Sequence, residues 1–381
     1  MNAPRIAGSA GGLTTCYTRA ERCGTLGLTG GEPDSELAGM TAAGFVTHAH
    51  FLDHAYPRHP ERPERLVAIL DHLDAMGLRR RLLDLTAREA TDEEILAVHS
   101  AVVVDVQERL ARKGGGWVDA DTFVNVDSPA IARLAAGAVV VATEAVLAGE
   151  VRSAFAAVRP PGHHATRHHL MGFCLLNNVA IAAAAVLRHG LERVAIVDWD
   201  VHHGNGTQDI FNDDPRVLYV STHAAPFYPG TGHFSESGAG AARGTKVNVP
   251  MPQGAGDTAY AAAYDRVVLP AVERFAPELI FISCGWDAHA RDFLGPLALS
   301  TSGYTAIAAK LMDLADAVCG GRVVAALEGG YDNHALAWCS SALVELMLGD
   351  EPTPDPEPVA AGSEPDIEQV LRAVRREVGL D

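Results

Sequence analysis

Five short runs of apolar and β-branched residues recur along the chain, and their alternation with helical segments limits the possible folds most. The runs cover residues 154–158, 193–197, 217–221, 279–283 and 323–327, and helical patterns at 175–188, 258–275 and 301–318 separate most of them. Alternation of strand and helix is typical of a parallel sheet with helices on both faces. The sequence therefore predicts an α/β fold around a parallel sheet.

Polar residues follow each of these runs. In chain order, the segments after the five runs carry His163 and His164; Asp198, Asp200, His202 and His203; a THAAPFYPGTG loop; Asp287; and Tyr331. In open parallel sheets, ligands bind beyond the carboxyl ends of the strands. Because all five strand ends deliver residues of this kind, we predict one common site at that edge of the sheet.

A metal site is predicted in the stretch VAIVDWDVHHGNGTQ at residues 194–208. Asp200 and His202 are two positions apart, so their side chains point the same way in an extended segment. A carboxylate with an imidazole suits zinc or another borderline divalent metal, and Asp287 can supply a third ligand while one position stays open for water. The alternative for this stretch alone is a polar turn whose histidines bond to neighbouring carbonyl groups.

The other polar residues indicate hydrolysis. Two carboxylate ligands acidify a metal-bound water less than three imidazoles would, so a helper base becomes useful, and the pair His163–His164 can supply it. Asp198 is placed to orient one of these rings and Asn205 the other. Tyr331 can donate its hydroxyl to a developing oxyanion, although a turn tyrosine is the better explanation of this residue taken alone. Together these groups predict amide or ester hydrolysis.

Composition narrows the class of protein. The 381-residue chain is 48% hydrophobic, enough for a large core, and has a formal net charge of −18. This acidity argues against nucleic acid as a direct partner and favours cationic substrates, although solubility alone also explains it. We expect no membrane span, because no stretch of about 18 apolar residues occurs, and no secretory signal. Six scattered cysteines without a disulfide framework fit a reducing, cytoplasmic setting.

Three parts are predicted along the chain. Residues 1–43 form an irregular N-terminal arm, which either packs on a neighbouring subunit of a homo-oligomer (a dimer or tetramer) or is disordered. Residues 44–350 form the catalytic domain. Residues 351–381 form a proline-rich linker and a helix at 364–378 that Ser363 caps.

Further helices and one group of histidines are predicted inside the catalytic domain. Helical spacing covers residues 62–76, 92–113 and 129–147, and Thr91 begins a capping box for the second of these helices. Histidines at positions 48, 50, 54 and 59 have no metal-ligand spacing, so we interpret them as loop residues.

Six motifs that contain these residues occur together in one known family. RPPGHHA, MGFCLLNN, DWDVHHGNGTQDIF, PGTG, GWDAH and LEGGYD, in this order, resemble the zinc-dependent histone deacetylase superfamily over about residues 44–348. The resemblance is greatest to its class II branch and to bacterial histone deacetylase-like amidohydrolases. It implies the arginase–deacetylase fold, with a central, mostly parallel eight-stranded sheet.

The resemblance also implies a role for each site residue. One zinc ion per chain would be held by Asp200, His202 and Asp287, with His163 and His164 as the tandem acid/base pair and Tyr331 polarising the acyl carbonyl. The implied substrate residues are Phe173 and Tyr228 beside a narrow acyl-lysine tunnel, Gly172 in its wall and Asp121 gripping the substrate backbone. A structural potassium ion would use Asp198, the carbonyl groups of Asp200, His202 and Thr222, and the Ser221 hydroxyl.

Two positions depart from patterns within the superfamily. Asn205 stands where class I members often carry Asp, a departure that class II members share. Leu294 stands where polyamine-specific relatives carry a gatekeeper Glu, which lowers the odds of an acetylpolyamine substrate.

The predicted function is therefore removal of acyl groups from N-acyl-lysine in peptides or proteins, or from a related acylated amine. The alternatives are a polyamine deacetylase, a non-catalytic acyl-lysine or acetate sensor, and an arginase-like ureohydrolase. The sensor is disfavoured because both histidines and Tyr331 are retained, and the ureohydrolase because carboxylates for a second metal are missing. The acyl length, the native metal (zinc or ferrous iron) and the oligomeric state stay open.

Overall fold

The computed structural model describes residues 41–360 and 362–381, and a single eight-stranded sheet lies at the centre of this part of the chain. The strands follow one another across the sheet in the order β2 (Leu83–Asp84), β1 (Thr41–Val46), β5 (Val151–Ala156), β10 (Val323–Leu327), β9 (Leu279–Cys284), β6 (Val194–Asp198), β7 (Val217–Ala224) and β8 (Lys246–Met251). Every neighbouring pair is parallel. The predicted α/β class and eight-stranded sheet are confirmed.

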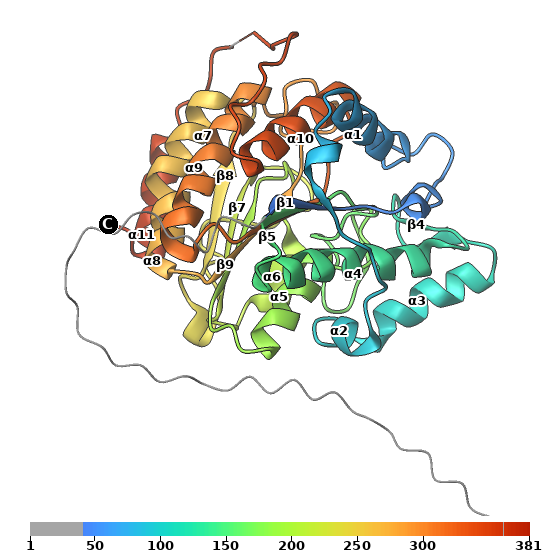
Figure 1. The fold of residues 1–381 in the computed structure, drawn as a ribbon. Coiled ribbons are helices and arrows are strands. Elements are labelled where there is room, and N and C mark those ends of the chain that lie inside the picture. The colour runs from blue at the N-terminus through green and yellow to red at the C-terminus, as the bar shows by residue number, and fades with distance from the viewer. Residues whose placement is uncertain (1–40, 361) are drawn as a thin grey trace, which may run out of the picture. The chain divides into compact units, whose positions relative to one another are not determined.

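Helices cover both faces of the sheet (Figure 1). On one face, α4 (Ser128–Leu147) packs on β1, β5 and β10, and α5 (Asn178–Arg188) packs on β6 and β9. On the other, α9 (Thr301–Cys319) packs on β9, α10 (Asn333–Met347) on β1 and β5, and α11 (Glu368–Val378) on β8. Because both faces are covered, β6, β7, β9 and β10 are buried along their whole length.

The remaining elements are short or lie outside these two layers. They are α1 (Glu64–Ala75), α2 (Asp92–Leu96), α3 (Ala101–Arg112), α6 (Asn205–Phe211), α7 (Asp257–Ala263), a π-helical turn (Tyr264–Val268), α8 (Leu269–Phe275), the antiparallel pair β3 (Gly116–Trp117) and β4 (Phe123–Val124), and the 3₁₀ turns Ala49–Leu52, Arg79–Arg81 and Gly240–Ala242.

One helix of the described part of the chain, α4, is long and apolar enough to cross a membrane by length and composition alone. In its most apolar window, 67% of the residues are buried against the rest of the protein. An apolar helix enclosed in this way is typical of the core of an α/β protein.

Several predicted boundaries were wrong. The single helix predicted at 92–113 is two helices, because the Ser100 amide donates to the Arg167 carbonyl (2.8 Å) and Ser100 takes the extended conformation that starts α3. The capping box at Thr91 is confirmed. Strand β1 begins at Thr41, before the start of the predicted domain at residue 44. The rest of the predicted N-terminal arm, residues 1–40, lies outside the described residues, as do Cys16 and Cys23.

The C-terminal segment also differs from the prediction. Helix α11 begins at Glu368 after Ile367, so Ser363 is not its cap. Glu364 instead accepts hydrogen bonds from the amides of Gly256, Thr258 and Ala259 at the start of α7, at 2.8–3.0 Å. A carboxylate at a helix N-terminus is favourable because it satisfies free N–H groups there.

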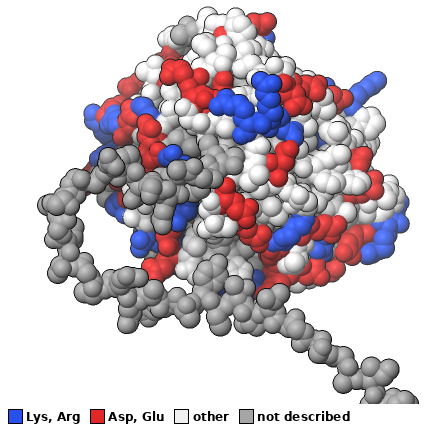
Figure 2. Space-filling model, viewed as in Figure 1, with Lys and Arg blue, Asp and Glu red and all other residues white. Residues whose placement is uncertain are grey.

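Acidic and basic side chains are interspersed in small groups over the face of the molecule in Figure 2. The exposed ion pairs of the described residues include Arg81–Asp350 and Lys310–Asp265, both at 2.5 Å. Exposed pairs of this kind contribute little to stability individually.

Candidate active site

The five strand ends that the sequence predicted to share a site belong to five neighbouring strands. These are β5, β10, β9, β6 and β7, in this order across the sheet. The carboxyl ends of parallel strands lie at one edge, so the loops that follow them converge there. This topology brings together residues that are up to about 170 positions apart in the sequence.

The three predicted metal ligands come together at this edge. Donor atoms of Asp200, His202 and Asp287 all lie within 4.8 Å of one another. His202 Nδ1 is 3.1 Å from Asp200 Oδ1 and 3.3 Å from Asp287 Oδ2, and both aspartates are fully buried.

These residues fit a divalent metal. Asp287 Oδ2 is buried without a hydrogen-bond partner of good geometry, which is costly for a carboxylate unless a cation balances it. Burial, and then the charge of Asp200, raises the pKa of Asp287, so a cation between the two carboxylates would relieve their repulsion. A side chain on Gly285 or Gly329 would overlap these carboxylates, so the cradle around them is closely packed. Two carboxylates and one imidazole are a ligand set of the catalytic zinc type.

The tandem histidines have different partners. His163 Nδ1 is 3.1 Å from Asp198 Oδ2, and His164 Nδ1 is 2.8 Å from the side-chain oxygen of Asn205. Because an amide oxygen can only accept, His164 carries its proton on Nδ1 and has a lone pair on Nε2.

Because their neighbours differ, the pKa values of the two imidazole rings shift in opposite directions. Burial alone would lower the pKa of His163, but the carboxylates of Asp200 and Asp198 outweigh it and raise that pKa. Burial, followed by the nearby His163 and His202, holds the pKa of His164 well below its usual range. A pair whose pKa values are pushed apart is suited to divide the acid and base roles.

Tyr331 lies in the loop after β10 and lines the same pocket as the two histidines. Burial raises the pKa of its phenol well above the ordinary value, so the hydroxyl stays protonated and can donate. The guanidinium of Arg65 lies 4.8 Å from the ring centroid, and Arg65 Nε donates to the Gly330 carbonyl at 2.5 Å. Asp292 accepts from the Tyr331 amide at 2.5 Å, which fixes the backbone on the other side.

A pocket of about 210 Å³ opens in front of these groups. All five predicted substrate residues line it, namely Asp121, Gly172, Phe173, Tyr228 and Leu294, together with both tandem histidines, His202 and Tyr331. Gly172 has φ of 56°, and a side chain there would overlap the His164 ring, so the wall requires glycine. Phe227, which the sequence analysis did not single out, also lines the pocket and stacks on His202 at 5.3 Å between centroids.

The residues of the predicted potassium site come from β6, from the segment that follows it and from β7. Asp198 is paired in register with Ser221, and the Thr222 hydroxyl is buried without a partner. His223 Nε2 lies 2.9 Å from the Gly232 carbonyl and must donate to it, so Nδ1 accepts from the Ser221 hydroxyl at 2.8 Å. The lone pairs of Ser221 Oγ are thereby left available to a cation, and the potassium site stays a prediction.

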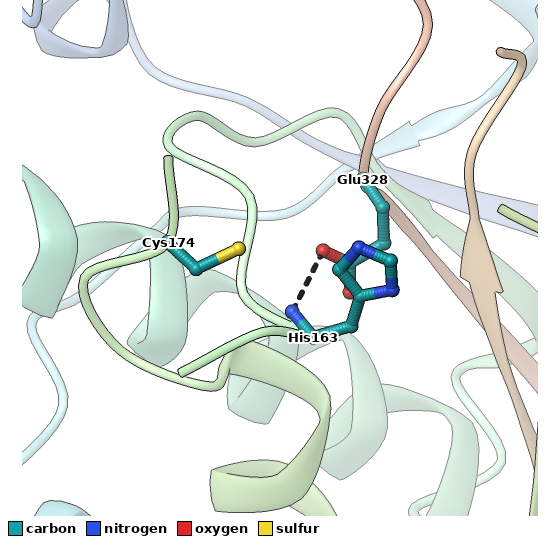
Figure 3. A group of neighbouring side chains, drawn as sticks. All are labelled: His163, Cys174 and Glu328. Carbon is teal, nitrogen blue, oxygen red and sulfur yellow. Dashed lines mark hydrogen bonds between the residues drawn. The ribbon is translucent and has the colours of Figure 1, made fainter. Parts of the chain in front are cut away.

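A second group of side chains of metal-ligand type consists of His163, Cys174 and Glu328 (Figure 3). Glu328 Oε2 accepts from the amides of Gly162 (2.6 Å) and His163 (3.1 Å), and Oε1 accepts from the Ser283 hydroxyl (3.1 Å). Burial raises the pKa of the Cys174 thiol well above its usual range, so it is a poor ligand. Because the carboxylate is already satisfied, Glu328 holds the backbone of the tandem histidines rather than an ion.

Glu328 was missed in the sequence analysis, where LEGGYD contributed only Tyr331. The available signal was a charged residue directly after an apolar strand. We expect Glu328→Ala to lower kcat about tenfold, because it frees the backbone that places His163. Glu328→Gln should retain most activity, since its amide oxygen can accept from both N–H groups while its nitrogen donates to Ser283. Steady-state kinetics with metal analysis checks this, and equal losses in both variants would contradict the role.

Comparison with known proteins is consistent with this geometry. Residues 59–347 match the histone deacetylase domain family. The chain is 43% identical over 310 residues to a probable deacetylase of Archaeoglobus fulgidus, covering 80% of this chain and 86% of that protein. It is 42% identical to the histone deacetylase-like amidohydrolase of Pseudomonas aeruginosa, covering 76% and 77%. It is 43% identical to the human polyamine deacetylase HDAC10, of which it spans 46%.

A solved structure also matches. The crystal structure of the HDA15 HD domain superposes with a TM-score of 0.81 at 38% identity, covering 88% of this chain and 94% of that one. These matches confirm the resemblance predicted from the six motifs. Because the family match covers well over half of the chain and relatives exceed 40% identity, the chain belongs to the histone deacetylase family of amidohydrolases.

Proposed function

We propose that the protein is a metal-dependent deacylase that removes acetyl or similar acyl groups from N-acyl-lysine side chains or related acylated amines. The observation that carries the proposal is the convergence of Asp200, His202 and Asp287 with the tandem histidines and Tyr331 around one narrow pocket. We propose zinc as the metal, with ferrous iron as the alternative, since the ligand set is compatible with either.

A zinc ion at this site would supply Lewis-acid polarisation and an acidified water. His164 Nε2 has the free lone pair that takes the proton of the attacking water, and Asn205 fixes the ring by accepting from Nδ1. His163, whose Nδ1 lies 3.1 Å from the Asp198 carboxylate, keeps its proton and places positive charge beside the reacting carbonyl. The Tyr331 hydroxyl donates to the carbonyl oxygen as negative charge develops there. The protonated His164 then returns its proton to the leaving amine nitrogen.

The pocket favours a long, neutral acyl-lysine chain. Phe173 and Tyr228 offer aromatic faces that bury methylene groups without requiring a charge. Leu294 adds an apolar contact at the pocket where a polyamine-specific site would need a carboxylate. An acetylated polyamine is the second candidate, because the chain is 43% identical to a polyamine deacetylase and has a net charge of −18.

The test is hydrolysis of a panel of acyl-lysine peptides and acetylated spermidine, with and without a chelator. We expect activity on acetyl-lysine peptides to exceed activity on acetylspermidine, to disappear after chelation and to return with added Zn²⁺ or Fe²⁺. Absence of hydrolysis of every acylated amine by metal-loaded protein, or activity that survives complete metal removal, would refute the proposal.

We propose three further properties. A cytoplasmic setting fits the four described cysteines, Cys174, Cys284, Cys319 and Cys339, which are all free and buried. A homo-oligomer and the lack of a direct nucleic-acid partner remain predictions from the sequence, the latter from its net charge of −18.

A further inference from the structure

The segment after the last helix of the matched domain is anchored to the catalytic fold. The family match ends at residue 347, yet the side chain of Asp355 is only 3% exposed and bonds to two helices of the domain. Asp355 Oδ2 accepts from the Thr301 hydroxyl (2.7 Å) at the start of α9, and Oδ1 accepts from His334 Nε2 (2.9 Å) in α10. This segment belongs to the red end of the colour scale in Figure 1.

The hydrogen bonds of Asp355 continue into the loop that carries Asp287. The Arg291 amide donates to His289 Nδ1 (3.1 Å), so His289 must carry its proton on Nε2. His289 Nε2 therefore donates to Thr301 Oγ1 (3.2 Å), and the Thr301 hydroxyl donates to Asp355. Each hydrogen bond in this series is therefore donated towards the C-terminal segment. The series ends on the Asp355 carboxylate, which can only accept.

A second contact reaches the same loop from the same segment. Arg291 Nη2 lies 3.3 Å from the Glu357 carboxylate, and the Glu357 amide donates to Asp355 Oδ1 at 2.8 Å. The ion pair itself is largely exposed, so on its own it contributes little. It matters because it is a second contact between the C-terminal segment and this loop. The ion pair lies at the surface, whereas the contact made through Asp355 is buried.

The loop of residues 286–294 carries three parts of the site. Asp287 is a proposed metal ligand and Leu294 lines the acyl pocket. Asp292 accepts from the amides of Tyr331 (2.5 Å) and Asp332 (3.1 Å), so it also places the proposed phenol donor. A group that holds this loop in place therefore acts on the metal ligand, the pocket wall and Tyr331 together.

We propose that Asp355 is a positioning residue, which ties the C-terminal segment through Thr301 and His289 to the active-site loop 286–294. The active-site consequence rests on the proposed deacylase function, whereas the structural link does not. Residues beyond the matched domain would then contribute to catalysis in this chain without touching the substrate.

The experiment compares full-length, metal-loaded variants by hydrogen exchange and by kinetics. Asp355→Ala and Thr301→Val, which removes only the hydroxyl at nearly constant shape, should each speed amide exchange in residues 286–294 about fivefold, the scale of one net hydrogen bond. Exchange in the fully buried strand β7 should not change. Thr301→Ser, which keeps the hydroxyl, should restore the wild-type rate, and the exposed Glu351→Ala serves as the control in the same segment.

The same variants are expected to rank in the same way in their kinetics. kcat/KM for an acetyl-lysine peptide should fall about fivefold in Asp355→Ala and Thr301→Val, with bound metal unchanged, and should be normal in Thr301→Ser. Unchanged exchange at 286–294 in both Asp355→Ala and Thr301→Val would overturn the inference, as would a Thr301→Ser variant that behaves like Thr301→Val. Wild-type protein without deacylase activity would refute the proposed function but leave the exchange result valid, so the two failures are distinguishable.

Discussion

Replacing His164 with alanine is expected to leave about one metal ion per chain while removing most of the turnover. The ring is not among the proposed ligands, and its Nδ1 proton is held by Asn205 Oδ1 at 2.8 Å, which leaves Nε2 as the base that faces the pocket. Positioned bases contribute about 10²- to 10⁴-fold to turnover, and a loss in that range is expected in kcat. Elemental analysis of the purified variant, together with kcat on an acetyl-lysine peptide, makes the measurement.

Two comparisons make this result interpretable. His50→Ala changes an exposed histidine that bonds to Asp53, and it should leave both metal content and kcat unaltered. Asp287→Ala should instead lose the metal and the activity together, because it removes a ligand. If His164→Ala loses its metal, His164 is a ligand rather than a base. If the variant keeps full turnover, His164 is not the catalytic base.

The central strands were predictable because they are continuous apolar runs, as expected for strands buried on both faces. Strand β8 was not predicted, because its sequence KVNVPM contains Lys246, Asn248 and a proline that are unusual in a strand. The structure accommodates Lys246 because its ammonium donates to the Val217 carbonyl at 2.8 Å and to the Thr245 hydroxyl at 2.7 Å. Such compensation depends on tertiary neighbours, which local propensity does not report.

The site was predictable to the extent that parallel strands share an edge. Asp200, His202, Asp287 and Tyr331 each follow a recognisable strand, so the topology alone gathers them. Arg65 was not found, since it is a single charge inside a helix whose contact with Gly330 spans 265 positions of sequence. Asp292 and Glu328 were missed because each acts by accepting backbone N–H groups of a distant loop, which leaves no spacing pattern in the sequence; the position of Glu328 directly after an apolar strand was the one available signal.

Tyr331→Phe is expected to lower kcat by about 10² or more while the metal stays bound. Removing one donor to a developing oxyanion typically costs about 10²- to 10³-fold in kcat. Since burial raises the pKa of the Tyr331 phenol well above its usual range, the hydroxyl stays protonated near neutral pH, and the effect of removing it should not depend on pH there. The ring is held by Arg65 at 4.8 Å and by the contact with Phe173 at 5.9 Å, so phenylalanine should keep its place.

The reference variant for this substitution is Tyr56→Phe. Tyr56 is exposed and lies outside the pocket lining, so it also loses one phenol hydroxyl but none that faces the site. Its kcat should match that of the wild type, whereas the kcat of Tyr331→Phe should fall. Turnover of Tyr331→Phe within twofold of the wild type would exclude the phenol as the oxyanion donor. The metal would then have to polarise the carbonyl. Among the protein groups, the positive charge of His163 would remain to stabilise the negative charge on its oxygen.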